Sequence, residues 1–238
     1  MSFRIKKHIP NMLTCCNLIS GCIATVYALV GDFRAALAFI IVGAVFDFFD
    51  GMSARLLNVP SPIGKELDSL ADDITFGVAP ATMVFCQLGI MDYPEWMNWS
   101  KEILPYAAFI MAAFSALRLA KFNLDTRQAT SFIGLPTPAN ALFWGSLLVG
   151  AGHIIESSPY MLFVVLALVA LCSYAMVAEI PMFALKFKHW GWKGNEVKYV
   201  FVGSCIPLII IFGISAFAVI ITWYVVLSVY VNHKEAKR

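Results

Sequence analysis

Eight apolar segments, each close to the length of a membrane-spanning helix, follow one another along the chain. They fall at about 12–31, 33–57, 65–90, 103–121, 134–156, 160–185, 197–212 and 214–232. About 20 apolar residues in a helix cross the hydrocarbon core of a bilayer. The composition agrees, because 60% of the 238 residues are hydrophobic and only 13% are charged, about half the charged fraction of a soluble domain. The sequence therefore predicts an all-α integral membrane protein, a bundle of about eight transmembrane helices.

Proline and glycine interrupt the later apolar segments. Pro181 falls in the sixth segment and Pro207 in the seventh, and a proline inside a helix removes a backbone hydrogen bond and bends the helix. Pro207 and Gly213 together divide one long apolar run, which fits either two short spans or one broken span. We expect a kink at each proline, and both arrangements of the last run stay open.

Lysine and arginine are distributed unevenly between the segments that join the predicted helices. If the N-terminus is cytoplasmic, only Arg34 and Lys101 lie on the outer side. The cytoplasmic side then holds Arg4, Lys6, Lys7, Arg55, Lys65, Arg118, Lys121, Arg127, Lys186, Lys188, Lys193, Lys198, Lys234, Lys237 and Arg238. This bias predicts a multi-pass protein of the cytoplasmic membrane with both termini inside. A basic cytoplasmic rim attracts anionic lipid head groups, so it does not indicate nucleic-acid binding.

Four aspartates, Asp47, Asp50, Asp68 and Asp72, interrupt the apolar pattern. Each charge at membrane depth costs roughly 2.5–3.5 kcal/mol, so the cluster needs a cation or a water-filled cavity. Asp47 and Asp50 share one face of a helix, and Asp68 and Asp72 share a face of the next. Two prolines within 56–62 force a short turn between these helices, which brings the pairs together at the predicted cytoplasmic face. Oxygen-only clusters suit Mg2+ or Mn2+, and two such ions can clamp a diphosphate.

Small residues and one arginine accompany the acids. Gly51, Ala54 and Gly64 lie on or beside the acidic face, where a missing side chain lets a ligand approach the backbone closely. Packing between membrane helices is the simpler explanation for each of these residues taken singly. The guanidinium of Arg55 is well shaped to hold phosphate oxygens through two hydrogen bonds. Its alternative role is that of a charge that sets membrane orientation.

The complete spacing resembles the signature of the CDP-alcohol phosphotransferase family. The pattern is Asp47-x2-Asp50-Gly51-x2-Ala54-Arg55-x8-Gly64-x3-Asp68-x3-Asp72, with every defined position present. The resemblance implies a membrane helix bundle, two divalent cations, and displacement of CMP from a CDP-linked lipid or alcohol by an acceptor hydroxyl. It implies that the acids hold metal, with Asp72 as a ligand or as the base that takes the acceptor proton. It implies that Gly51 and Ala54 leave room for cytidine and that Arg55 holds phosphate.

Segments at 10–21, 76–81, 118–123 and 132–139 are similar to the members of this family whose acceptor is serine. This similarity implies CDP-diacylglycerol as the donor and L-serine as the acceptor, with phosphatidylserine and CMP as products. Serine carries a carboxylate, for which Arg118 is the candidate cation, although a cation at a helix C-terminus also interacts favourably with the helix dipole. Lys121 stands where these relatives often have a second arginine. A lysine keeps the charge but cannot form the bidentate hydrogen bonds of a guanidinium, which weakens a bidentate role for Lys121.

Asn11, Thr14 and Asn17 recur on the first predicted helix. The resemblance favours contact with the nucleotide or its phosphates, whereas side chains of these types also cap helices or contact interfacial water. We expect a single membrane domain over 1–238, with the signature at 47–72, acceptor-type motifs to about 140 and additional membrane helices over 141–238. Because relatives are often dimers, a homodimer is a further expectation.

Three alternatives stay open. One is the same chemistry with another acceptor, glycerol 3-phosphate or inositol phosphate, or with an ether-lipid donor. A phosphorylated acceptor would need more cationic residues around its pocket. Another is an intramembrane prenyltransferase, which would leave Gly51, Ala54, Arg55 and Gly64 without an explanation. The last is an ion transporter, which predicts acids near the bilayer midplane.

Overall fold

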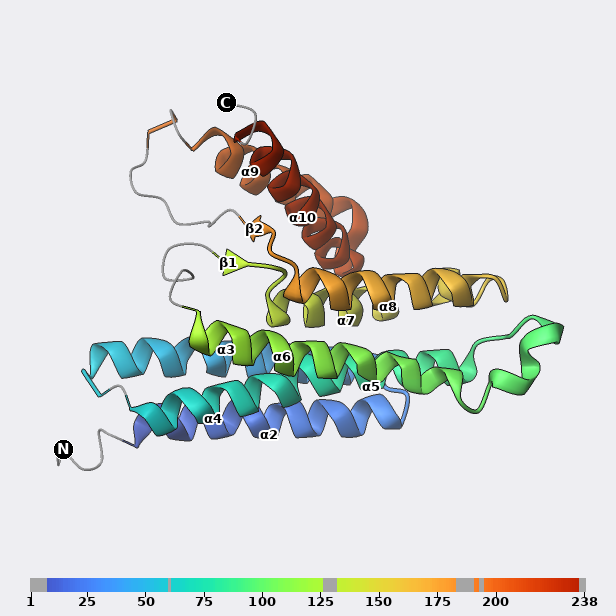
Figure 1. Cartoon of the computed structure of the whole chain (residues 1–238), viewed down its shortest axis with the longest axis horizontal. Helices are drawn as coiled ribbons and strands as arrows, with labels where there is room; N and C mark the ends of the chain where they lie inside the picture. Colours follow the sequence, from blue (N-terminus) through green and yellow to red (C-terminus); the bar gives the residue numbers. More distant parts are fainter. Residues whose placement is uncertain (1–7, 60, 126–131, 183–190, 193–194, 236–238) are drawn as a thin grey trace.

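The computed structural model describes residues 8–59, 61–125, 132–182, 191–192 and 195–235. Within these residues the chain is helical almost throughout (Figure 1). The helices are α2 (Ile9–Leu29), α3 (Phe33–Leu56), α4 (Pro62–Asp72), the π-helix η1 (Asp73–Val78), α5 (Ala79–Ile90), the 3-10 helices η2 (Glu95–Ser100) and η3 (Leu104–Phe109), α6 (Ile110–Leu124), α7 (Thr137–Ile155), α8 (Met161–Val177), α9 (Glu196–Phe212), η5 (Gly213–Ser215) and α10 (Ala216–Glu235). The predicted all-α fold is confirmed.

Six helical segments among the described residues are long and apolar enough to cross a membrane. They are Ile9–Leu29, Phe33–Leu56, Pro62–Ile90, Leu104–Leu124, Thr137–Ile155 and Glu196–Asn232, and α8 is a shorter apolar helix. Large apolar side chains face outward on these helices, as Ile210 and Leu171 do with 78% and 61% of their surface exposed. Exposed apolar side chains in such numbers are expected where lipid, not water, surrounds the protein. The chain is therefore a multi-pass membrane protein.

The last apolar run, Glu196–Asn232, is divided at Gly213. This residue has φ 55° and ψ −123°, a conformation that glycine adopts much more readily than other residues. It ends α9, and Figure 1 shows α9 and α10 lying side by side, with contacts between them. Pro207 lies inside α9 and does not end it. Of the two arrangements left open for this run, the structure has two packed helices.

The sixth predicted helix is shorter than expected. We predicted a span over 160–185, but α8 ends at Val177 and Ala178 is extended. Pro181 therefore does not kink a helix: it lies in the two-residue strand β2 (Pro181–Met182), which pairs antiparallel with β1 (Phe132–Ile133). The carbonyl of Pro181 also accepts a hydrogen bond from the side chain of Asn232 on α10. Apolar composition alone did not reveal this change from helix to extended chain.

A tight turn between α3 and α4 positions the acids. The helix α3 ends at Leu56, and Asn58 has φ 52°, a left-handed conformation that asparagine tolerates. Ser61 then caps α4 by accepting a hydrogen bond from the backbone N–H of Gly64 at 3.0 Å, and Pro62 occupies the first turn, where its missing N–H costs nothing. The expected helix-turn-helix arrangement is confirmed, although α4 begins three residues earlier than predicted.

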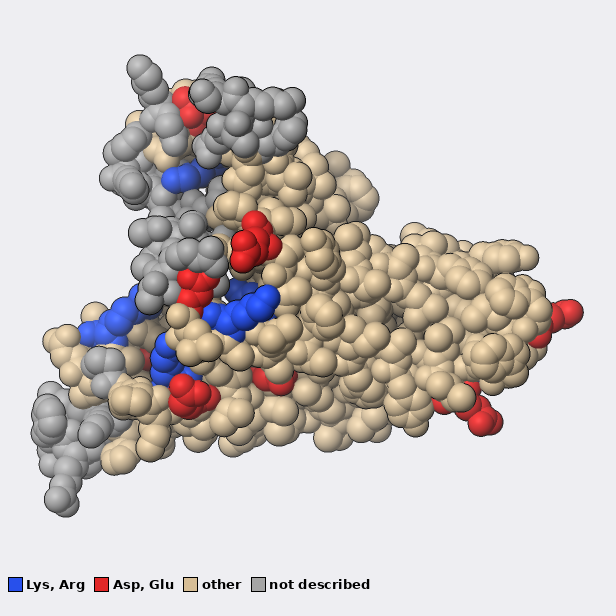
Figure 2. Space-filling view, viewed as in Figure 1, with Lys and Arg blue, Asp and Glu red and all other residues tan. Residues whose placement is uncertain are grey.

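The helices form a bundle around α2, α5 and α7. The helix α2 packs against α3, α4 and α5, and α7 packs against α3, α5 and α10. The core contains Trp144, Phe76, Met83 and Met111, all fully buried. On the face shown in Figure 2, the visible lysines and arginines gather at the left end, the end at which α3 ends and α4 begins in Figure 1. The lysines and arginines visible in this view are therefore concentrated at one end of the bundle, as their uneven distribution along the sequence indicates.

Candidate metal and substrate site

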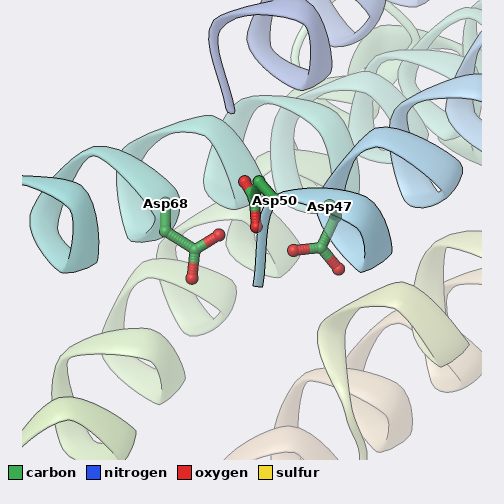
Figure 3. A group of neighbouring side chains, drawn as sticks. All are labelled: Asp47, Asp50 and Asp68. Atoms are coloured by element: carbon green, nitrogen blue, oxygen red, sulfur yellow. The ribbon is translucent and has the colours of Figure 1, made fainter. Parts of the chain in front are cut away.

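Three of the four signature aspartates gather at one point. Oxygen atoms of Asp47, Asp50 and Asp68 all lie within 4.8 Å of one another, and Figure 3 shows the three side chains coming together from α3 and α4. The side chain of Asp50 is buried, and Oδ1 of Asp68 is buried without a hydrogen-bond partner among the described residues. Carboxylates this close repel one another unless a cation lies between them. Such an oxygen-only set fits a hard divalent cation, and the cluster can bind a metal.

Asp72 lies outside this group of three. It is at the end of α4, with 8% of its surface exposed. Its Oδ1 accepts a hydrogen bond from the amide Nδ2 of Asn17 on α2 at 3.0 Å. Asp72 is thus held in one orientation by a neutral donor, which leaves its other oxygen for a different partner. The nearby carboxylates therefore have two environments, a three-residue cluster and a separately held acid.

The side chain of Thr14 also contacts an acid. Its hydroxyl lies 2.6 Å from Oδ2 of Asp50 and 3.1 Å from the carbonyl of Pro10. We expected Thr14 and Asn17 to contact the nucleotide, and the structure places both against signature aspartates. The spacing of Thr14 and Asn17 along α2 indicated that they share a face of this helix. The spacing did not indicate which groups lie opposite that face.

A cavity of about 240 Å³ lies on the α2 side of the acids. Its lining contains two signature acids, three small signature residues and several polar side chains: Pro10, Asn11, Thr14, Asp50, Gly51, Ala54, Val59, Ser61, Gly64, Lys65 and Asp68. A Cβ built on Gly64 would lie 3.0 Å from Oγ of Ser61 and 3.1 Å from Oδ1 of Asn11. A side chain at position 64 would therefore crowd the wall of this cavity.

Arg55 and Lys65 complete the description of this end of the bundle. The exposed side chain of Arg55 folds back, so that its Nε donates to the carbonyl of Gly51 at 2.9 Å. Lys65 lines the cavity, and its Nζ lies 2.8 Å from the carbonyl of Asn123. The sequence alone accounts for Lys65 only as a charge that sets membrane orientation. Its position one turn after the Ser61 cap was the signal that places it on the side of the acids.

A second cavity, of about 320 Å³, contains the predicted acceptor residues. Arg118 and Lys121 line it together with Asp125 and Glu179, and apolar side chains complete the wall. Arg118 is buried, its Nε has no hydrogen-bond partner among the described residues, and its charge interacts with that of Asp72. Lys121 is exposed. From the sequence, Glu179 is an acid in an apolar run that could pair with a cation such as Arg118, and the structure places both in the wall of this cavity. Sequence reasoning did not single out Asp125, which follows the end of α6.

The comparisons with known proteins agree with this geometry. A sequence model of the CDP-alcohol phosphatidyltransferase family matches residues 7–174. The chain is 36% identical over 190 residues to the CDP-diacylglycerol–serine O-phosphatidyltransferase of Bacillus subtilis, covering 77% of this chain and 92% of that protein. It is 30% identical over 224 residues to the enzyme of the same name from Helicobacter pylori, covering 92% and 89%.

A relative from Methanocaldococcus jannaschii has the same name, and it is 32% identical over 222 residues, with 92% of each chain covered. The similarity therefore extends across bacterial and archaeal proteins and includes nearly the whole chain. The family match over residues 7–174 contains all four signature aspartates and the whole described lining of the first cavity. The protein is accordingly a member of the CDP-alcohol phosphatidyltransferase family.

Proposed function

We propose that this protein transfers the phosphatidyl group of CDP-diacylglycerol to the hydroxyl of L-serine, giving phosphatidylserine and CMP. The observation that carries the choice of acceptor is the charge of the second cavity, where Arg118 and Lys121 face the same space as Asp125 and Glu179. Among the described lining residues, two cations and two anions suit a zwitterion, since they can hold the carboxylate and the ammonium of serine. A phosphorylated acceptor would favour a cavity with excess positive charge.

The first cavity is the proposed donor site. Gly51, Ala54 and Gly64 leave space along its wall, and Asn11 and Thr14 supply polar groups. In this proposal the cytidine and diphosphate of the donor lie here, with Arg55 released from Gly51 to hold a phosphate. Asn17 contributes through its hydrogen bond to Asp72. The acyl chains then extend toward the lipid-facing side of the bundle.

Asp47, Asp50 and Asp68 are the proposed metal ligands, with Asp72 as a further ligand or as the base. Two divalent cations, Mg2+ or Mn2+, would neutralise charge on the donor diphosphate when bound. Asp72 would accept the proton of the serine hydroxyl as the new phosphoester bond forms, since a carboxylate within reach of the hydroxyl can act as a general base. The charge of Arg118 acts on Asp72 from the side of the acceptor cavity. This interaction between Arg118, which lines the second cavity, and Asp72 supports the assignment of that cavity to the acceptor.

The test measures CMP release by the purified protein in detergent. CDP-diacylglycerol and Mn2+ or Mg2+ would be supplied with serine, glycerol 3-phosphate, inositol phosphate or no acceptor. We expect serine-dependent release that Asp72→Asn abolishes and Asp92→Asn, an exposed aspartate after α5, leaves unchanged. Release with a different acceptor would contradict serine as the substrate. Absence of release with every acceptor would contradict the proposed reaction and return attention to the prenyltransferase and transporter alternatives.

The membrane orientation is also a proposal. The lysine and arginine distribution supports a cytoplasmic N-terminus, C-terminus and active site. A reporter fused to the C-terminus that is active only in the cytoplasm would test this orientation. Activity of a reporter that works only outside the cytoplasm would contradict it.

The homodimer and the single domain over 1–238 stay predictions. Cross-linking in native membranes would test the first, and truncation after α8 would test the second.

A further inference from the structure

The π-helix η1 begins directly after Asp72. A π-helix is rare, and one inside an α-helical segment often marks a functional site. Here it separates α4 from α5 within a single span, Pro62–Ile90. The widened turn changes the direction in which its side chains point. Thr75, near the middle of η1, is fully buried and contacts both α2 and α3.

The hydroxyl of Thr75 bonds to the backbone of a neighbouring helix, which the hydroxyls of Thr82 and Thr25 do not. The hydroxyl of Thr82 donates to the carbonyl of Val78 four residues earlier, and that of Thr25 donates to Gly21 in the same way. Such bonds stay within one helix. The hydroxyl of Thr75 instead donates to the carbonyl of Asn17 on α2 at 3.0 Å. It therefore connects two helices.

Asn17 is thereby held at two points by the same span. Its backbone carbonyl accepts from Thr75, and its side-chain amide donates to Asp72, three residues before Thr75. Both contacts are buried. Either bond alone would join only one part of Asn17, the backbone or the side chain, to this span. Two bonds fix the distance and the direction of its amide toward the carboxylate.

Two glycines make this approach possible. A Cβ on Gly21 would lie 2.7 Å from Cα and 2.9 Å from the backbone nitrogen of Thr75, and it would also meet the threonine hydroxyl. A Cβ on Gly43 would lie 2.5 Å from Cγ2 of Thr75 and 2.9 Å from Oδ1 of Asn17. Gly43 is on α3, one turn before Asp47. Thr75 is therefore enclosed by the helices that carry the acids and the asparagine.

We propose that Thr75, enclosed by Gly21 on α2 and Gly43 on α3, is a positioning residue that orients Asp72 through Asn17. The inference rests on the proposed function, because it assigns Asp72 a place in phosphatidyl transfer. Nothing in the signature requires a threonine at this position. The role is inferred from the contact, because the hydroxyl of Thr75 donates to Asn17, the residue whose amide holds Asp72.

The first test compares Thr75→Val, which removes the hydroxyl and keeps the shape, with Thr75→Ser, which keeps the hydroxyl. Changes in residues that orient a catalytic or metal-binding group typically cost 10–100-fold, so we expect Thr75→Val to lower kcat by about that factor. KM for CDP-diacylglycerol and for serine should stay within about twofold, and Thr75→Ser should retain most of kcat, as a purely orienting role requires. Thr82→Val is the matched control.

A kcat for Thr75→Val equal to that of Thr82→Val would overturn the inference, as would equal losses in Thr75→Ser and Thr75→Val. If Thr75→Val does not yield folded protein, the comparison moves to Thr75→Ser and the glycine variants. Wild-type protein without activity toward any acceptor would instead contradict the proposed function, and it would leave the second test in place.

The second test uses thermal unfolding and needs no activity. Gly43→Ala should lower Tm, because its Cβ would press on the methyl of Thr75. Thr75→Ser removes that methyl, so Gly43→Ala should cost less in the Thr75→Ser background, a coupling expected of residues in contact. Gly152→Ala, where a Cβ meets nothing within 4 Å, is the control. Equal losses of Tm in both backgrounds would show that Gly43 and Thr75 are independent and would overturn the packing on which the inference depends.

Discussion

The amide of Asn17 and the carboxylate of Asp72 are joined by a buried hydrogen bond of 3.0 Å between α2 and the end of α4. Removal of the amide in Asn17→Ala leaves Asp72 without its described donor. We expect kcat to fall about 10–100-fold, the usual effect of losing a partner that orients a functional carboxylate. Steady-state CMP release measures the change. Asn98→Ala, at an exposed position in η2, is the control. If Asn17→Ala has the same kcat as Asn98→Ala, Asn17 does not orient Asp72.

The cluster of Asp47, Asp50 and Asp68 predicts a dependence on divalent metal. Asp68→Asn removes a charge from the three-carboxylate group and should raise the Mn2+ concentration needed for half-maximal activity by 10-fold or more, on the order of the loss of one good ligand interaction. Glu66→Gln, an exposed change on the same helix, should leave it unchanged. EDTA should abolish activity and added Mn2+ restore it. Full activity in EDTA would remove the metal from the proposal.

Much of the fold follows from hydrophobic length. The spans up to α7 were predicted to within a few residues, since apolar segments of membrane length leave the backbone few alternatives to helix. The spacing of Asp47 and Asp50, and of Asp68 and Asp72, also placed the acids on two adjacent helices. Only Asp47, Asp50 and Asp68 form the close group, however. The separate environment of Asp72 depends on Asn17, which is distant in the chain.

The features that sequence reasoning missed are set by tertiary contacts. The sequence of η1 (Asp73–Val78) is apolar enough for an ordinary α-helix, and its π geometry accompanies the close approach of Thr75 to α2 and α3. The end of α8 at Val177 similarly coincides with pairing between β1 and β2. The π geometry has no local composition signal. For the end of α8, Pro181 is a local signal, since a proline disfavours helix in the residue before it, but the sequence does not show the pairing with β1. Ser61 and Pro62 did carry a local signal for the start of α4, in the form of a cap followed by proline.

The wall of the donor cavity at Gly51 allows a selective test of nucleotide binding. A Cβ at this position would meet only Nη2 of Arg55, at 3.9 Å, so Gly51→Ala should fold normally. The added methyl enters the cavity instead and should raise KM for CDP-diacylglycerol about tenfold, within the range that one methyl group costs in a tight pocket. Gly89→Ala, with open space around it, is the control. An unchanged KM would place the donor elsewhere.

The bond between Gln87 on α5 and Glu156 after α7 predicts an effect on stability alone. Nε2 of the buried Gln87 donates to Oε1 of Glu156 at 2.9 Å, at the end of the span opposite the start of α4. Gln87→Met should therefore lower the free energy of unfolding by about 1 kcal/mol while kcat stays unchanged. Glu156→Gln, which keeps an acceptor oxygen, should cost less. Chemical or thermal unfolding in detergent measures both, and a loss of kcat in folded Gln87→Met protein would contradict the assignment.

The charges of the acceptor cavity predict which substrate each variant affects. Lys121→Ala removes an exposed cation from the cavity wall and should raise KM for serine several-fold, the size of an exposed ionic contact. Arg118→Lys keeps the charge of a buried residue but loses the planar group that can hold a carboxylate by two bonds, so its KM for serine should rise by about tenfold or more. Both variants should leave KM for CDP-diacylglycerol unchanged, because neither residue lines the donor cavity. Lys101→Ala, where the cation lies over the Tyr93 ring, is the control. Equal increases in KM for serine and KM for CDP-diacylglycerol would show that the two cavities do not separate donor from acceptor.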